Sequence, residues 1–135
     1  NLNKTYEIKN YMKKKNKKII CIDIDNTICK TFLNKYENSK PYKKKIQFIN
    51  NLYHRGYFIK LFTSRYMGRN KENEKKAKKQ GYNYTKKQLK DWGLNYNELI
   101  FGKPSFDIYI DDKNLEFKSS WPTILKKKLK ILKNK

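Results

Sequence analysis

The sequence predicts an α/β fold in which an open parallel sheet is flanked by helices. Short apolar runs typical of buried strands alternate with amphipathic helical patterns, and this order favours parallel pairing of the strands. The chain has 135 residues, a length that fits a single domain. We expect that domain to span residues 18–135, and we interpret the polar, basic residues 1–17 as an N-terminal extension.

The first half of the domain contains two predicted strands with a helix between them. Residues 19–24 form a short apolar run rich in β-branched side chains, which predicts a buried strand. Pro41 opens a helical pattern of apolar residues that Gly56 closes. Residues 57–63 follow at once and predict the second strand.

The second half predicts two further strands and two further helices. Thr85 is expected to cap a short helix that ends at Gly93. Residues 99–101 and 106–110 are expected to form short strands, and a final amphipathic helix is expected from Trp121 onward. In an open parallel sheet ligands bind at the carboxyl ends of the strands, so polar residues at those ends are the candidates for function.

The formal net charge of +22 favours anionic partners, which are nucleic acid, a membrane surface or phosphorylated substrates. Only Arg55, Arg65 and Arg69 are arginine, whereas nucleic-acid sites favour arginine for bidentate contacts. Lys, Asn, Ile and Tyr share A/T-rich codons. We therefore favour compositional bias over a dedicated nucleic-acid surface, and nucleic acid stays the second choice of partner.

Two features of the sequence indicate the cellular compartment of the protein. No apolar run approaches the roughly 18–20 residues of a membrane span. Cys21 and Cys29 suggest no disulfide framework, so we expect both to be reduced thiols in a cytoplasmic protein.

The strongest local signal is the run from Asp23 to Thr27, directly after the first predicted strand. Asp23 and Asp25 are two residues apart, so their carboxylates repel each other unless a positive charge lies between them. A divalent cation removes that repulsion, and oxygen ligands indicate magnesium. The alternative is an acidic turn that caps a helix, which an Asp-Asn-Thr run also forms.

A second acidic pair, Asp111 and Asp112, follows the strand predicted at 106–110. The chain has only 12 acidic residues, so two such pairs at strand ends are hard to attribute to chance. Neighbouring strands would bring both pairs to one edge of the sheet. The alternative is a solvated acidic turn.

Two further residues complete the pattern. Thr63, with Ser64 beside it, ends the second predicted strand and offers a hydroxyl to a phosphate oxygen. Lys103 precedes the acidic strand and can neutralise both an aspartate and a phosphate. Each signal is weak alone, because threonine ends many strands and lysine is abundant in this chain.

Taken in order, these four pieces resemble the motifs of the haloacid dehalogenase superfamily, over about residues 18–125. Asp23, Thr63, Lys103 and the pair Asp111–Asp112 match its Asp-x-Asp-x-Thr loop, strand-terminal hydroxyl, lysine and acidic pair. The resemblance implies a Rossmann-like sheet. The segments between the motifs are too short for a cap domain, and members without one take large substrates or cover the site with a neighbouring subunit or fused enzyme.

The resemblance also implies a role for each acidic residue. Asp23 would be the nucleophile that forms an aspartyl-phosphate, and Asp25 the general acid and then the general base. Mg²⁺ would be bound by Asp23, by Asp25 through its main-chain carbonyl, and by Asp112 with support from Asp111.

The remaining matched residues would bind phosphate or substrate. The resemblance places Asn26, Thr27, Thr63, Ser64, Arg65 and Lys103 around the phosphoryl group, and Arg65 and Arg69 are candidates for substrate contact. A closer resemblance is to small haloacid dehalogenase proteins linked with capsule or surface-polysaccharide synthesis. It implies a sugar or polyol phosphate as the substrate.

Three other functions remain open at this point. A nucleic-acid end phosphatase acting on a 3′-phosphate would account for the basic charge. A non-catalytic basic binding module would not need the repelling carboxylates that this sequence keeps. A phosphotransferase would share the same first half-reaction, and the motifs do not exclude it.

Overall fold

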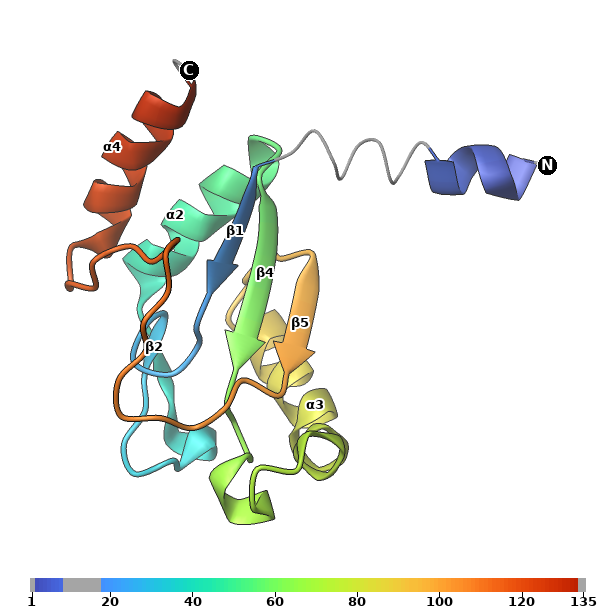
Figure 1. Ribbon diagram of the computed structural model, residues 1–135, viewed down its shortest axis with the longest axis vertical. Coiled ribbons are helices and arrows are strands. Elements are labelled where there is room, and N and C mark those ends of the chain that lie inside the picture. Colours follow the sequence, from blue (N-terminus) through green and yellow to red (C-terminus); the bar gives the residue numbers. More distant parts are fainter. Residues whose placement is uncertain (1, 9–17, 134–135) are drawn as a thin grey trace. The chain divides into compact units, whose positions relative to one another are not determined.

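The computed structural model describes residues 2–8 and 18–133, of which 2–8 are helical (Figure 1). The rest of the predicted N-terminal extension lies outside the described residues. The chain divides into two compact units, Asn1–Ser105 and Phe106–Lys135. All the regular strands described below belong to the first unit.

A three-stranded parallel sheet forms the centre of the first unit. Its strands are β1 (Ile19–Ile22), β4 (Phe58–Thr63) and β5 (Glu98–Phe101), in the order β1-β4-β5. At the carboxyl end Thr63 pairs with Phe101. The predicted parallel α/β sheet is therefore confirmed for these three strands, which are Rossmann-like in their alternation with helices.

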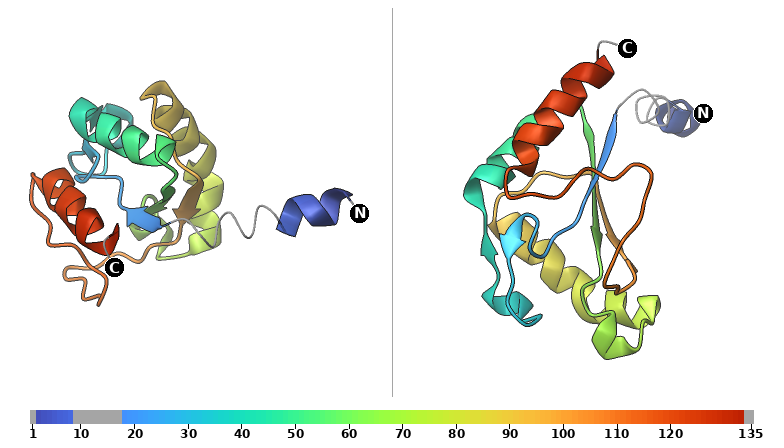
Figure 2. Two further views of the ribbon diagram at one scale, coloured as in Figure 1. Left: turned by 90° about the horizontal axis from the view of Figure 1, so that it is seen from above. Right: turned by 60° about the vertical axis from the view of Figure 1, so that its left-hand side comes forward.

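Two helices pack on the same face of this sheet, as the two views in Figure 2 show. The first is α2 (Lys43–His54), whose buried residues are Ile46, Ile49 and Leu52. Helix α2 links β1 to β4, and α3 (Glu74–Asp91) links β4 to β5. This arrangement follows from two successive right-handed crossovers in the same direction.

A small antiparallel pair, β2 (Cys29–Lys30) and β3 (Lys40–Pro41), lies between β1 and α2, with the 3-10 helix η1 (Tyr36–Asn38) in its loop. Pro41 was expected to open the helix, but it pairs with Cys29 instead. Proline is acceptable in this short edge strand because it has no N–H to leave unpaired. The helix begins two residues later.

Helix α3 is longer than the sequence predicted, and Thr85 is not its cap. Asn73 caps it, because its side chain accepts a hydrogen bond from the Lys76 N–H. Thr85 lies buried inside the helix. The buried positions recur every four residues, at Ala77, Gly81, Thr85 and Leu89. Small and polar residues occupy most of them, so hydrophobic periodicity did not reveal the first half of the helix.

The strand predicted at 106–110 does not form. Ile108 and Ile110 are 81% and 93% exposed, and no strand is assigned there. The rings of Phe106 and Tyr109 stack with centroids 4.8 Å apart. An extended strand would point residues three apart to opposite faces, so this stacking requires a bent chain. The final predicted helix is confirmed as α4 (Trp121–Lys133).

None of the helices among the described residues combines the length and apolar character needed to cross a membrane.

Candidate functional site

The candidate site begins where β1 ends. After Ile24, whose side chain is completely buried, the chain turns back, and the Ile24 carbonyl accepts hydrogen bonds from the Thr27 and Ile28 N–H groups. Asn26 makes this turn with a positive φ of 60°, which asparagine tolerates better than most residues. The turn holds Asp23 and Asp25 at the carboxyl end of the sheet.

Lys103 reaches Asp23 from the end of β5. Its Nζ lies 3.4 Å from Asp23 Oδ1, and the Thr27 hydroxyl donates to Asp23 Oδ2 over 3.3 Å. The Lys103 N–H also donates to the Thr63 carbonyl, which fixes the lysine next to the end of β4. Lys103 therefore forms an ion pair with Asp23 across the end of the sheet.

The Asp23 carboxyl has a raised pKa. Burial is the largest cause, because it penalises the charged form, and the nearby Asp25 charge adds to it. Lys103 acts in the opposite direction but does not cancel the effect of burial. The Asp23 side chain is still 33% exposed, so solvent and a substrate can reach it.

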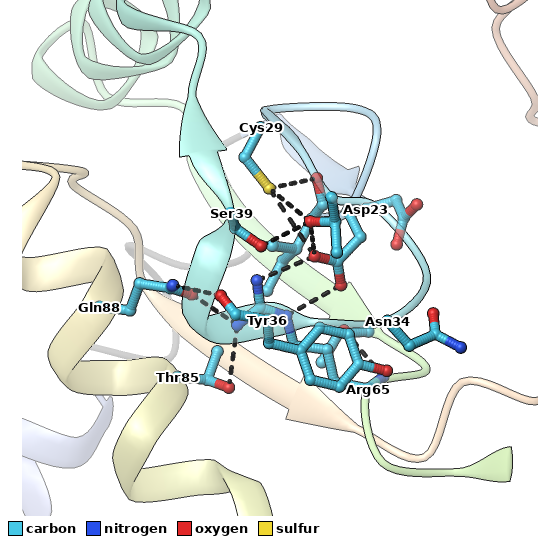
Figure 3. Close-up of polar contacts among 12 residues, drawn as sticks. Asp23, Cys29, Asn34, Tyr36, Ser39, Arg65, Thr85 and Gln88 are labelled. Atoms are coloured by element: carbon cyan, nitrogen blue, oxygen red, sulfur yellow. Dashed lines mark hydrogen bonds and ion pairs between the residues drawn. The ribbon is translucent and has the colours of Figure 1, made fainter. Parts of the chain in front are cut away.

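Arg65, which is labelled in Figure 3, binds Asp25 in a bidentate pair. Arg65 Nε lies 2.8 Å from Asp25 Oδ2, and Nη2 lies 2.9 Å from Oδ1. The Thr31 hydroxyl also donates to Oδ1. The Arg65 side chain is completely buried and that of Asp25 is 19% exposed. Such a fork-to-fork pair fixes the carboxylate in both position and orientation.

The rest of the Arg65 guanidinium contacts residues of α3 and η1. Nη1 donates to Gln88 Oε1 over 2.7 Å and, more weakly, to the Thr85 hydroxyl over 3.4 Å. Its guanidinium carbon lies 4.7 Å from the centroid of the Tyr36 ring. Gln88 in turn donates to the Tyr36 carbonyl. Arg65 thus connects the Asp25 loop to α3 and η1.

These contacts change the role expected of Arg65. From the sequence we expect Arg65 to contact the substrate, but its side chain is completely buried among protein partners. Burial alone would lower the pKa of the Arg65 guanidinium, yet hydrogen bonds and charge from Asp25 outweigh burial and raise that pKa. Arg65 is therefore a permanently charged anchor for Asp25.

The two carboxylates each have their own cation. The sequence predicts a divalent ion near Asp23 and Asp25; among the protein's own side chains, Lys103 pairs with Asp23 and Arg65 pairs with Asp25. No sequence pattern predicts that this network also includes Thr31, Tyr36, Thr85 and Gln88. The only available hint was that Arg65 is one of three arginines among 34 basic residues.

The predicted phosphate-binding residues are largely occupied by loop contacts. Thr63 is 1% exposed, and its hydroxyl accepts from the Arg65 N–H over 3.1 Å. The Asn26 amide oxygen accepts from the Thr31 N–H over 3.1 Å. Ser64 is half-buried, and its carbonyl accepts from the Met67 N–H. These bonds shape the turns after β1 and β4.

The second acidic pair belongs to the second unit. Asp111 and Asp112 are exposed, and the Asp111 carboxylate accepts from the Lys113 N–H over 2.9 Å. This backbone bond is the main reason why the pKa of Asp111 is lowered. Across residues 2–8 and 18–133 no three acidic, histidine or cysteine side chains gather as a metal-binding group. Of the two carboxylates that follow β1, Asp23 is the more exposed, at 33% against 19% for Asp25.

The two cysteines differ in environment and give a testable contrast. Cys29 is buried beside Thr31, and burial raises the pKa of its thiol, whereas Cys21 is exposed on β1. The thiolate is the reactive form, so we expect iodoacetamide to label Cys21 and spare Cys29 near neutral pH. Peptide mass spectrometry reads out the labelling, and the unfolded protein is the control in which both sites react. Equal labelling in the folded protein would contradict the burial of Cys29.

Comparisons with known proteins support the fold and go no further. No protein-family model matches the chain, and no curated protein matches it. The chain is similar to the crystal structure of a target protein from Vibrio cholerae, with a TM-score of 0.68 and 22% identity over 82% of this chain and 98% of that one. At this identity the likeness establishes a shared α/β fold.

Proposed function

We propose that this protein is a magnesium-dependent phosphomonoester hydrolase that works through an aspartyl-phosphate on Asp23. The observation that supports it best is the environment of that carboxylate. Asp23 is accessible at the carboxyl end of a parallel strand, with Lys103 at 3.4 Å. A cation there stabilises both the nucleophile and an incoming phosphoryl group. The fold alone is compatible with many activities, so the proposal depends on this site.

In the proposed reaction an Asp23 oxygen forms a bond to phosphorus as the bond to the alcohol oxygen breaks. The alcohol leaves with the bonding electrons and takes a proton from Asp25. Water then attacks phosphorus and gives a proton to Asp25, which releases inorganic phosphate and regenerates the Asp23 carboxylate. Both oxygens of Asp25 are bound by Arg65 in the structure, so proton transfer requires one oxygen to turn toward the substrate.

Magnesium fits the oxygen chemistry of the site, but the first unit does not supply a complete set of ligands. Asp23 and the main-chain carbonyl of Asp25 are the ligands proposed there, with Asp112 and its neighbour Asp111 as the further carboxylates. When bound, the ion would neutralise charge that develops on the phosphoryl oxygens. Lys103 would share this task, and Asn26, Thr27, Thr63 and Ser64 would hold the phosphoryl group.

We propose a sugar or polyol phosphate as the substrate, on the resemblance to proteins of surface-polysaccharide synthesis. One observation favours a second candidate, a nucleic-acid end phosphatase, because the chain has 34 basic and 12 acidic residues. Dependence on salt separates the two. Turnover of an oligonucleotide with a terminal phosphate should fall steeply with salt, and turnover of a small sugar phosphate should not.

The direct test is phosphate release from sugar phosphates, glycerol phosphates and 3′-phosphorylated oligonucleotides in the presence of Mg²⁺. We expect preferential release from a sugar or polyol phosphate. Preference for the oligonucleotides would select the second candidate. Absence of release from every compound would count against a phosphatase and in favour of a binding protein.

Removal of the metal gives a separate prediction. Excess chelator is expected to stop phosphate release, because the charge on the phosphoryl oxygens would lose its main stabilising group. Addition of Mg²⁺ beyond the chelator should restore the activity, which controls for damage to the protein. Undiminished release in excess chelator would refute the metal site.

A further inference from the structure

A second arginine lies beside the network of Arg65 but has a different environment. Arg69 belongs to the short 3-10 helix η2 (Gly68–Asn70), which follows β4 on the site side of the sheet. Its Nη2 donates to the Asn34 carbonyl over 3.1 Å. Its guanidinium carbon lies 5.2 Å from the Tyr36 ring centroid and 4.8 Å from that of Tyr66. Two rings and one carbonyl therefore hold this exposed cation in place.

Arg65 and Arg69 contact the same Tyr36 ring, at 4.7 and 5.2 Å, but only one of them is neutralised. Arg65 is buried and paired with Asp25. Arg69 is exposed, and within the described residues no carboxylate forms an ion pair with it. The nearby acid Glu72 is committed to Ser105, from which it accepts two hydrogen bonds. The positive charge of Arg69 thus remains available to a ligand.

The backbone conformation and the packing around Tyr66 fix the position of its ring, which is one of the two rings that hold Arg69. Tyr66 has a positive φ of 65° and packs against Tyr36, with centroids 4.9 Å apart. Its ring lies on Gly81 in the middle of α3, where a Cβ would be only 2.1 Å from ring atoms. A glycine inside a helix is unfavourable by about 1 kcal/mol relative to alanine. Gly81 is therefore explained by the room it leaves for Tyr66.

We propose that Arg69 is a binding residue for a second phosphate group of the substrate. This inference rests on the proposed function and deepens it, because it makes the preferred substrate a bisphosphorylated small molecule. The planar guanidinium matches phosphate oxygens, and the tyrosines fix it before the ligand arrives. Tyr36 packs on Arg65 (Figure 3), and Arg65 binds Asp25, two residues from the proposed nucleophile. Arg69 therefore lies at the same end of the sheet as Asp23.

The test measures binding in an Asp23→Asn background with Mg²⁺, where turnover does not interfere. Two matched pairs of probes are used: a hexose bisphosphate with the hexose monophosphate, and a nucleoside bisphosphate with the nucleoside monophosphate. Arg69→Gln is expected to reduce the preference for the bisphosphate on the order of tenfold, the effect of one charge-assisted contact. The pair with the larger preference shows whether the second phosphate belongs to a sugar or to a nucleoside.

Two further variants make the test specific. Arg55→Gln removes the same charge from an exposed arginine at the end of α2 and should leave the preference unchanged. Gly81→Ala keeps the arginine but displaces the Tyr66 ring, so it should reduce the preference as Arg69→Gln does. Circular dichroism confirms that each variant is folded.

Three results would overturn the proposal: equal binding of both members of each pair by the parent, an unchanged preference in Arg69→Gln, or the same reduction in Arg55→Gln. Failure of the proposed function looks different. If the Arg69-dependent preference is present but the parent protein releases no phosphate from any compound, the binding site stands and the hydrolase does not.

Discussion

Asp23→Asn is expected to abolish phosphate release, by on the order of a thousandfold or more, while the fold stays intact. Asparagine keeps the size of the side chain and one oxygen, but it cannot form the acyl-phosphate that divides the reaction into two steps. Release of inorganic phosphate is measured with the best substrate of the panel, and circular dichroism monitors the fold. Equal activity of the variant and the parent would refute the covalent mechanism.

The same substitution is expected to stabilise the metal-free protein at neutral pH. The folded-state pKa of Asp23 is raised, mainly by burial, so the folded protein binds its proton more tightly than the unfolded chain does. Stability linked to this group is therefore lost as pH rises through the unfolded and then the folded pKa. Asparagine carries no such charge, so the gain from Asp23→Asn should be present near pH 7 and vanish in acid.

Thermal unfolding as a function of pH checks this expectation, and Asp91→Asn is the matched control. Asp91 pairs with Lys87 on the exposed face of α3, where such pairs contribute little. Its substitution should shift the unfolding temperature slightly at all pH values. If Asp23→Asn instead destabilises the protein at neutral pH, the ion pair with Lys103 stabilises the folded state by more than the burial of the Asp23 charge destabilises it.

The parts of the fold that the sequence predicted have clear local signals. The strands β1, β4 and β5 are short, largely apolar runs, and this local pattern depends little on the rest of the chain. The approach of Lys103 to Asp23 was also predictable, because the carboxyl ends of parallel strands share one edge. A long lysine side chain spans the intervening strand β4.

The features of the site that the sequence did not predict depend on contacts between residues far apart in the chain. Arg65 could be paired with Asp25 only by knowing that α3 brings Thr85 and Gln88 against the end of β4. Those two polar residues occupy the inner face of a helix that hydrophobic periodicity would assign to solvent. The error at 106–110 is of the opposite kind, because a run rich in β-forming residues forms no strand there, and Phe106 stacks on Tyr109 instead.

Arg65→Met is expected to produce the largest loss of stability of any single substitution considered. Methionine fills part of the volume but leaves the Asp25 carboxylate, which is 19% exposed, without its cation. Removal of one partner of a buried ion pair lowers the free energy of unfolding by about 3–5 kcal/mol. Denaturant unfolding followed by circular dichroism measures the change, and Arg55→Met, at an exposed position, should stay within about 0.5 kcal/mol of the parent.

A double-mutant cycle separates the ion pair from the packing of Arg65. Asp25→Asn removes the charge that Arg65 neutralises, so Arg65→Met should be markedly less harmful in that background. The remaining loss would report the contacts of Arg65 with Gln88 and the Tyr36 ring. Additive losses would mean that Asp25 and Arg65 do not stabilise each other, and the assignment of Arg65 as the anchor of Asp25 would then be wrong.

Arg65→Lys separates the charge of Arg65 from its geometry, because lysine keeps the positive charge but lacks the planar guanidinium that binds both oxygens of Asp25. A lysine ammonium cannot span both oxygens of Asp25 as Nε and Nη2 do at 2.8 and 2.9 Å. Stability should therefore lie between those of the parent and Arg65→Met. In the proposed reaction Asp25 must turn one oxygen toward the leaving group. A looser partner is expected to change kcat while the protein stays folded, and an unchanged kcat in Arg65→Lys would mean that the role of Arg65 is purely structural.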